Sequence, residues 1–151
     1  MIHRRGFAVA LIVGFVTAGV ALAADRGESA AQAAAESWLA LVDGGNYPAS
    51  WNQAARGLKA SVKQADWSQV VGGARAPLGR LMSRKLKSSE YTEKVPTTRM
   101  VGGNLYTLAG SGRYVVLQYD TAFAHKPSAV ETVISMADPD GAWRVSGYSV
   151  H

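Results

Sequence analysis

Three charged residues lie where a folded domain has little room for a charge. Glu131 lies within the otherwise apolar stretch 130–136, and Asp120 lies in another such stretch, next to Tyr119. Arg75 lies between a glycine pair and a proline, which restricts the backbone at that point. A charge among apolar residues must face solvent, pair with an opposite charge or line a pocket. Arg75, Tyr119, Asp120 and Glu131 are therefore the candidate ligand-binding residues.

Two interpretations of Arg75 are open. In the first, its guanidinium forms a structural ion pair, for which Glu131 is the predicted partner. In the second, it anchors the carboxylate or phosphate of a ligand. An acid–base enzyme is a further alternative, in which Asp43, Asp120 or Glu131 would supply the reacting carboxylate.

The sequence contains no complete motif for metal binding, nucleophilic catalysis or nucleotide binding. After the first 23 residues the sequence has only two histidines, His125 and His151, and it has no cysteine. A metal site needs three or four converging ligands. No serine lies in a Gly-x-Ser-x-Gly turn, and there is no phosphate loop or dinucleotide motif. We therefore expect no catalytic residues, no metal and no cofactor.

The first residues have the three parts of a secretory signal peptide. Arg4 and Arg5 precede the apolar run Phe7–Val20, and Ala21-Leu22-Ala23 is a small-x-small cleavage triplet. A retained membrane anchor is the alternative, but the run is shorter than the roughly 20 apolar residues that span a bilayer. The sequence predicts cleavage after Ala23, a single domain over residues 24–151, and a periplasmic or secreted location. Membrane contact would then occur only through the signal peptide.

The charge limits the class of partner. A formal net charge of +5 is a mild surplus, which argues against nucleic acid as the partner of an exported protein. The densest basic stretch is Arg80, Arg84, Lys85 and Lys87. It is either a solvated strand face or a patch for phosphate or anionic lipid. The expected partner is a small ligand or an envelope protein.

The elements that would position these residues follow from periodicity. Helical spacing of apolar residues predicts helices over 29–43, 47–62 and 64–71, with a capping box at Ser29 and Gln32 and a stop at Gly72-Gly73. A polar edge strand is predicted over 84–92, a loop over 96–112 with a short strand around 105–108, and strands over 113–123, 130–137 and 143–150, with turns at 126–128 and 138–141. Helices followed by antiparallel strands predict an α+β domain, its helices packed on one face of a curved sheet. Large aromatic residues should form much of its core: Trp38, Trp51, Trp67, Trp143, Tyr114, Tyr119 and Tyr148.

Several of these segments resemble a bacterial family of unknown function, DUF4019. The resemblance rests on residues 38–44, 47–51, Trp67, 75–79, 114–123, 131–133 and 140–148. It implies no activity. The element order is also similar to a nuclear-transport-factor-2-like cone or a cystatin-like roll, folds that commonly hold a pocket between helices and sheet and serve many functions.

Taken together, these features favour a non-enzymatic exported module that binds a ligand or another protein. The alternatives are an acid–base enzyme of the isomerase or hydrolase type, and a structural accessory of an envelope complex. A buried polar pair beside a pocket would favour the ligand binder, whereas a large exposed apolar patch would favour the accessory.

Overall fold

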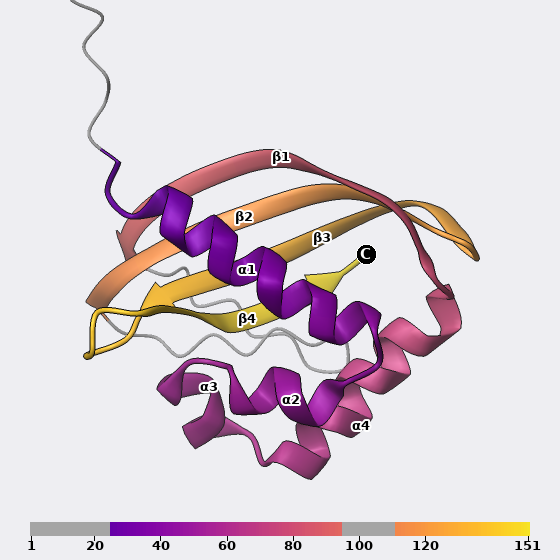
Figure 1. Ribbon diagram of the computed structural model, residues 1–151, viewed down its shortest axis with the longest axis horizontal. Helices are drawn as coiled ribbons and strands as arrows, with labels where there is room; N and C mark the ends of the chain where they lie inside the picture. The colour runs from indigo at the N-terminus through magenta and orange to yellow at the C-terminus, as the bar shows by residue number, and fades with distance from the viewer. Residues whose placement is uncertain (1–24, 95–110) are drawn as a thin grey trace, which may run out of the picture.

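The computed structural model describes residues 25–94 and 111–151. In these residues, helices come first in the chain and pack against a four-stranded antiparallel sheet with the strand order β1-β2-β3-β4 (Figure 1). The elements are α1 Glu28–Asp43, α2 Tyr47–Asn52, α3 Arg56–Ser61, α4 Gln64–Arg75, the 3-10 helix Ala76–Leu78, β1 Leu81–Lys94, β2 Ser111–Phe123, β3 Lys126–Ala137 and β4 Trp143–Val150. The α+β prediction is confirmed, and β1 is an edge strand as predicted. The predicted signal peptide, residues 1–23, lies outside the described residues.

The start of α1 differs from the predicted capping box. Ser29 lies inside the helix, and Gln32 donates a hydrogen bond to Glu36 instead of reaching back to the cap. The N-cap residue is Gly27, and Asp25, two residues before it, accepts hydrogen bonds at Oδ1 from the backbone N–H groups of Gly27, Glu28 and Ser29. A carboxylate suits this position because free N–H groups and the helix dipole favour negative charge at a helix N-terminus.

The later helices also differ from those predicted by the spacing of apolar residues. The predicted second helix is two short ones, α2 and α3, separated by residues 53–55. Gly72-Gly73 does not end α4, which continues to Arg75. A Cβ at Gly72 would lie 3.1 Å from Cε2 of Tyr47, so glycine here gives the Tyr47 ring room against the helix. The longer α4 carries Arg75 to the junction with the sheet.

The first three strands begin earlier than predicted. β3 starts at Lys126, so the expected turn at 126–128 is already strand, paired through Phe123 and Lys126. The predicted loop 96–112, with its short strand around 105–108, lies outside the described residues apart from Ser111 and Gly112, which begin β2. The turn at 138–141 is confirmed, with Gly141 N–H donating to the Asp138 carbonyl.

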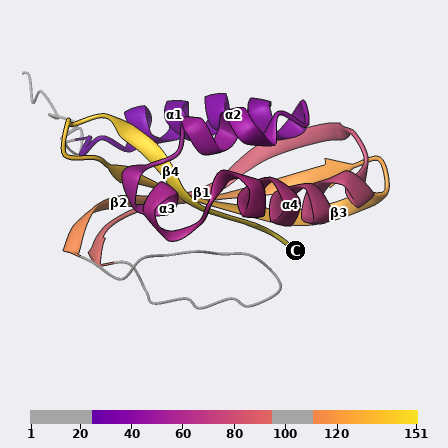
Figure 2. The same cartoon turned by 90° about the horizontal axis from the view of Figure 1, so that it is seen from below.

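The core lies between the sheet and the helices. α1 crosses one face of the curved sheet and contacts all four strands, and α2 lies on the same side (Figures 1 and 2). Trp38 stacks in tilted geometry on Trp67 and Tyr148, with ring centroids 5.9 and 5.4 Å apart. Trp51 and Trp143 pack at the edge of this core, and Tyr114 belongs to a second apolar cluster with Ile134. The aromatic core prediction is confirmed.

No helix within residues 25–94 and 111–151 is both long enough and apolar enough to span a membrane.

Candidate functional site

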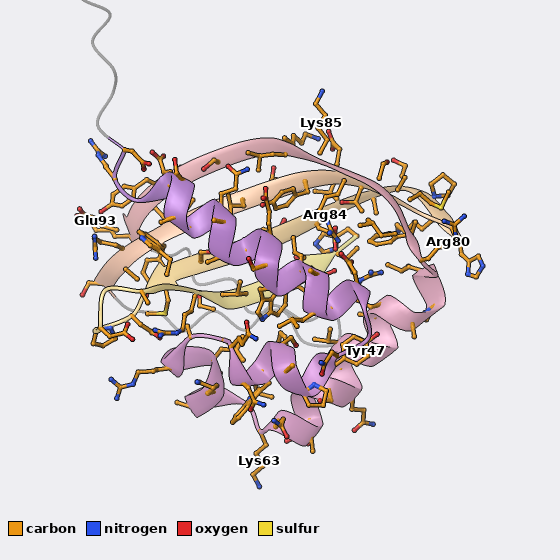
Figure 3. All side chains as sticks on the ribbon, viewed as in Figure 1. Tyr47, Lys63, Arg80, Arg84, Lys85 and Glu93 are labelled. Carbon is orange, nitrogen blue, oxygen red and sulfur yellow. The ribbon has the colours of Figure 1, made fainter. Side chains whose placement is uncertain are left out.

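Four charged side chains meet where the ends of α1 and α4 approach the sheet. Asp43 is the last residue of α1, Arg75 is the last residue of α4, and Arg84 and Glu131 lie on β1 and β3. Arg84 donates to both oxygens of Asp43, at 2.7 and 2.9 Å, and its Nε donates to Glu131 at 2.6 Å. Arg75 Nη2 donates to Asp43 at 2.9 Å. We call these residues the four-charge cluster. In Figure 3 Arg84 is labelled between β1 and the C-terminal half of α1.

Strand alternation delivers the buried members of the cluster to one face. Successive strand side chains point to opposite faces, and Arg84 is paired in register with Thr121 on β2. Glu131 has no exposed surface, yet it accepts hydrogen bonds from Arg84, from Thr121 Oγ1 at 2.8 Å and from Tyr148 OH at 2.5 Å. The Glu131 carboxylate therefore has three hydrogen-bond donors around it, which a buried charge requires.

Arg75 is only partly satisfied. Its side chain is 3 % exposed and its guanidinium carbon lies 4.1 Å from the centroid of the Phe123 ring. Nη2 contacts Asp43, but within the described residues Nε and Nη1 have no hydrogen-bond partner. A guanidinium is weakly hydrated and stacks well on an aromatic face, which accounts for its position. Two buried donor nitrogens are left over.

Two of the buried tyrosines, Tyr119 and Tyr148, differ in whether their hydroxyl groups have a hydrogen-bond partner. The Tyr119 hydroxyl is buried and has no partner among the described residues, whereas the Tyr148 hydroxyl is bound to Glu131. Burial raises the pKa of Tyr119 to about 12, and the negative charge of Glu36 adds to this shift. Burial, together with the adjacent Glu131 carboxylate, raises the pKa of Tyr148 well above its usual value.

Arg84 remains charged despite its burial. Burial by itself lowers the pKa of Arg84, but the hydrogen bonds to Asp43 and Glu131 outweigh that effect and raise the pKa overall. The four-charge cluster thus contains two cations and two carboxylates. Asp43 and Arg84 keep 17 % and 13 % of their side-chain surface exposed, so the cluster reaches solvent on that side.

The sequence-predicted site residues do not all come together. Arg75 and Glu131 belong to the cluster, and Tyr119 is next to Glu131 in the sheet register. Asp120 is on the opposite face, where its 59 % exposed side chain contacts Lys87 at 3.2 Å. Alternation explains this, because Asp120 follows the inward-facing Tyr119.

The prediction that Arg75 and Glu131 form a direct ion pair is wrong. Arg75 pairs with Asp43, and Glu131 pairs with Arg84. Sequence reasoning placed Arg84 in a basic stretch on the surface. Its spacing of two residues from Leu86, however, puts both side chains on the same face of the strand. Sequence reasoning also missed Thr121 as a hydrogen-bond donor to Glu131, because no local pattern in the sequence indicates this contact.

Open grooves occur elsewhere in the described part of the chain. One of about 450 Å³ lies between α1, the end of α2 and the start of β4, with Ser37, Gln53 and Trp143 in its lining. Another of about 410 Å³ lies on the outer face of the sheet beside Lys85 and Asp120. Neither is lined by Arg75 or Glu131. Within residues 25–94 and 111–151, no three His, Cys, Asp or Glu side chains are grouped to hold a metal ion.

Comparison with known proteins gives one match. Residues 34–148 match a family described as "Protein of unknown function (DUF4019)". No curated protein and no solved structure matches the chain.

Proposed function

The chain belongs to the DUF4019 family, whose description names no activity, and we propose that it is a non-enzymatic binding module that acts outside the cytoplasm. In this proposal the four-charge cluster frames the site of a small ligand, between the helices and the sheet. Export is supported by the signal-peptide pattern that ends at Ala23.

The observation that carries the proposal is the set of buried polar atoms without partners. Arg75 Nε, Arg75 Nη1 and the Tyr119 hydroxyl are buried and unpaired among the described residues. Most buried polar groups in proteins are hydrogen-bonded, and each exception calls for a partner. A ligand that supplies an acceptor to Arg75 would provide one.

The carboxylates support binding rather than acid–base catalysis. A general base needs an oxygen free to reach the proton it removes. Glu131 accepts hydrogen bonds from three donors, and Asp43 accepts three hydrogen bonds from two arginines. Asp120, the remaining candidate, is exposed on the other face and paired with Lys87. We therefore favour a binding role over the isomerase or hydrolase alternative.

Native mass spectrometry of the protein purified from its own host tests this function. We expect the folded protein to carry the added mass of a small molecule, which denaturation releases. Removing that molecule should lower Tm, and restoring it should raise Tm, because a ligand that binds only the folded state stabilises it.

Asp120→Asn provides the matched control, since Asp120 lies on the far face of the sheet and should leave ligand retention unchanged. A stoichiometric protein complex with no small molecule would instead support a structural accessory. A ligand-free mass under native conditions, with no Tm response to the host's extracted small molecules, would contradict the proposal.

A further inference from the structure

We infer that the free edge of β1 is an interface at which two copies of this chain pair, strand against strand and antiparallel. The inference is independent of the proposed ligand binding, because it concerns the edge of the sheet and not a pocket. Three features of the described residues support it: the openness of β1, a bulge within the strand, and the pattern of charges along it.

β1 is open along one side. Leu81–Lys94 is the longest strand described, and within residues 25–94 and 111–151 it pairs only with β2 (Figure 1). None of its 14 residues is buried. Ser89 is exposed even though its partner in register, Leu117, is fully buried on the side of the helices. A strand with a row of unpaired backbone N–H and C=O groups is a template for pairing with another strand.

The opposite edge of the sheet is partly covered. The Val145 carbonyl of β4 accepts a hydrogen bond from the backbone N–H of Ala55 at 2.8 Å, immediately before α3. No such backbone hydrogen bond joins β1 to a helix in the described part of the chain. Lysines and bulges also discourage the pairing of edge strands, and β1 has both. Its charges therefore decide which strand it can accept.

Symmetry limits the registers that two copies of β1 can adopt. Identical strands pair antiparallel about a two-fold axis that passes through one residue position, because directly opposite residues must share a face of the sheet. In the proposed pairing Lys87 stays outside the ladder, as it does opposite β2, where it separates Leu86 from Ser88. With the axis at Ser88, the opposing pairs are Leu86 with Ser89, Lys85 with Glu90, Arg84 with Tyr91, and Ser83 with Thr92. The β2 partners of these residues show that both members of each pair lie on the same face.

The charges select this register. Lys85 and Glu90 both lie on the face away from the helices, and neither forms an ion pair within the described residues. Figure 3 shows the Lys85 side chain extending from β1 away from the helices. The axis at Ser88 places Lys85 of each copy opposite Glu90 of the other, and opposite charges in such pairs are stabilising. Parallel pairing would instead set Lys85 beside its own copy, which is unfavourable.

Charge reversal tests the interface. Sedimentation equilibrium of the mature protein should show a reversible dimer, because strand pairing alone buries limited surface. Lys85→Glu and Glu90→Lys should each raise Kd of the dimer by about tenfold or more, since each sets like charges opposite one another at two places. The double variant restores opposite charges, and its Kd should return to within about threefold of the original value. Lys63→Glu, the same change of charge just before α4, is the control and should leave Kd unchanged (Figure 3).

A single introduced cysteine tests the register, since the chain has none of its own. Ser88→Cys places two thiols opposite each other across the axis, at a Cα separation that a disulfide accepts, about 4.4–6.8 Å. Mild oxidation should therefore link this variant into a covalent dimer. Ser83→Cys is the matched control on the same face of β1. It lies opposite Thr92 of the second copy and should not cross-link with itself.

Three results would overturn the inference. A monomer at every concentration would show that the β1 edge does not pair with a second copy, whatever else occupies it. A dimer that both single charge reversals leave intact would place the interface elsewhere, as would equal cross-linking of Ser88→Cys and Ser83→Cys. A complex with a different protein through β1, formed by a chain that is monomeric on its own, would show a heterologous partner. The release of a small molecule on denaturation is measured separately and tests the proposed function by itself.

Discussion

Arg84 Nε lies 2.6 Å from Oε2 of Glu131, a carboxylate with no exposed surface. The same guanidinium contacts both oxygens of Asp43. Arg84 therefore links the edge strand β1 to β3 and to the end of α1. It is the one residue of the four-charge cluster that contacts both carboxylates.

Replacing Arg84 should strongly destabilise the fold. Arg84→Met leaves Glu131 buried with two neutral donors and removes two of the three hydrogen bonds to Asp43. Removing one partner of a buried ion pair typically costs about 3–5 kcal/mol of unfolding free energy. Urea unfolding measured by circular dichroism provides the value. Lys87→Met, an exposed cation on the same strand, is the control and should stay within about 0.5 kcal/mol. Equal effects of the two variants would show that the cluster contributes no special stability.

Removing the hydroxyl groups of Tyr119 and Tyr148 should have different effects on stability. Tyr148→Phe deletes a donor to buried Glu131 and should cost about 1–3 kcal/mol of unfolding free energy. Tyr119→Phe deletes a hydroxyl that has no partner in the described residues, so it should be neutral or slightly stabilising. The same urea experiment measures both. A large loss in Tyr119→Phe would mean that this hydroxyl has a partner, such as a bound ligand or water.

Alkaline pH should destabilise the protein partly through Tyr119. Its folded pKa is about 12, above the usual value of 10.0, because burial disfavours the phenolate. Below pH 10 both states hold the proton, and the contribution to stability is complete. As pH rises from about 10 to 12, the unfolded state ionises first, so this contribution is lost. Ultraviolet titration of tyrosinate should show one late-titrating tyrosine fewer in Tyr119→Phe. An unchanged count above pH 11 would contradict the assignment.

Periodicity in the sequence predicted most elements because local spacing determines them. The strand Trp143–Val150 matches its prediction at both ends, and α1 departs only at its start. The errors arise where tertiary contacts outweigh local rules. Gly72-Gly73 has the residue type that ends helices, yet α4 continues to Arg75, and Gly72 packs closely against the Tyr47 ring.

The site was only partly predictable for a related reason. Arg75 and Glu131 stood out against their immediate neighbours, which a sequence shows. Their true partners, Asp43 and Arg84, come from the end of one helix and from a strand with many polar residues. The pairing depends on how separate elements pack together, and no spacing along the chain encodes it.

Export should remove the first 23 residues. Arg4, Arg5 and the apolar run that follows have the arrangement of a cleaved signal peptide. Intact-mass analysis of the protein from its own host should give a chain that begins at Ala24. A full-length chain in the membrane fraction would support the membrane-anchor alternative instead.

Alanine substitutions at two glycines with positive φ should distinguish the cost of backbone strain from the cost of steric crowding. Gly27, at φ 99°, and Gly141, at φ 83°, both adopt the left-handed region, where other residues typically cost about 1–2 kcal/mol. An added Cβ at Gly27 would lie 2.6 Å from Trp143 Nε1, whereas at Gly141 it would meet nothing within 4 Å. Gly141→Ala should therefore show only the strain, and Gly27→Ala should lose about 1–3 kcal/mol more through overpacking against Trp143. Thermal unfolding measures the difference. Equal losses in the two variants would indicate that the start of α1 moves away from Trp143 at little cost.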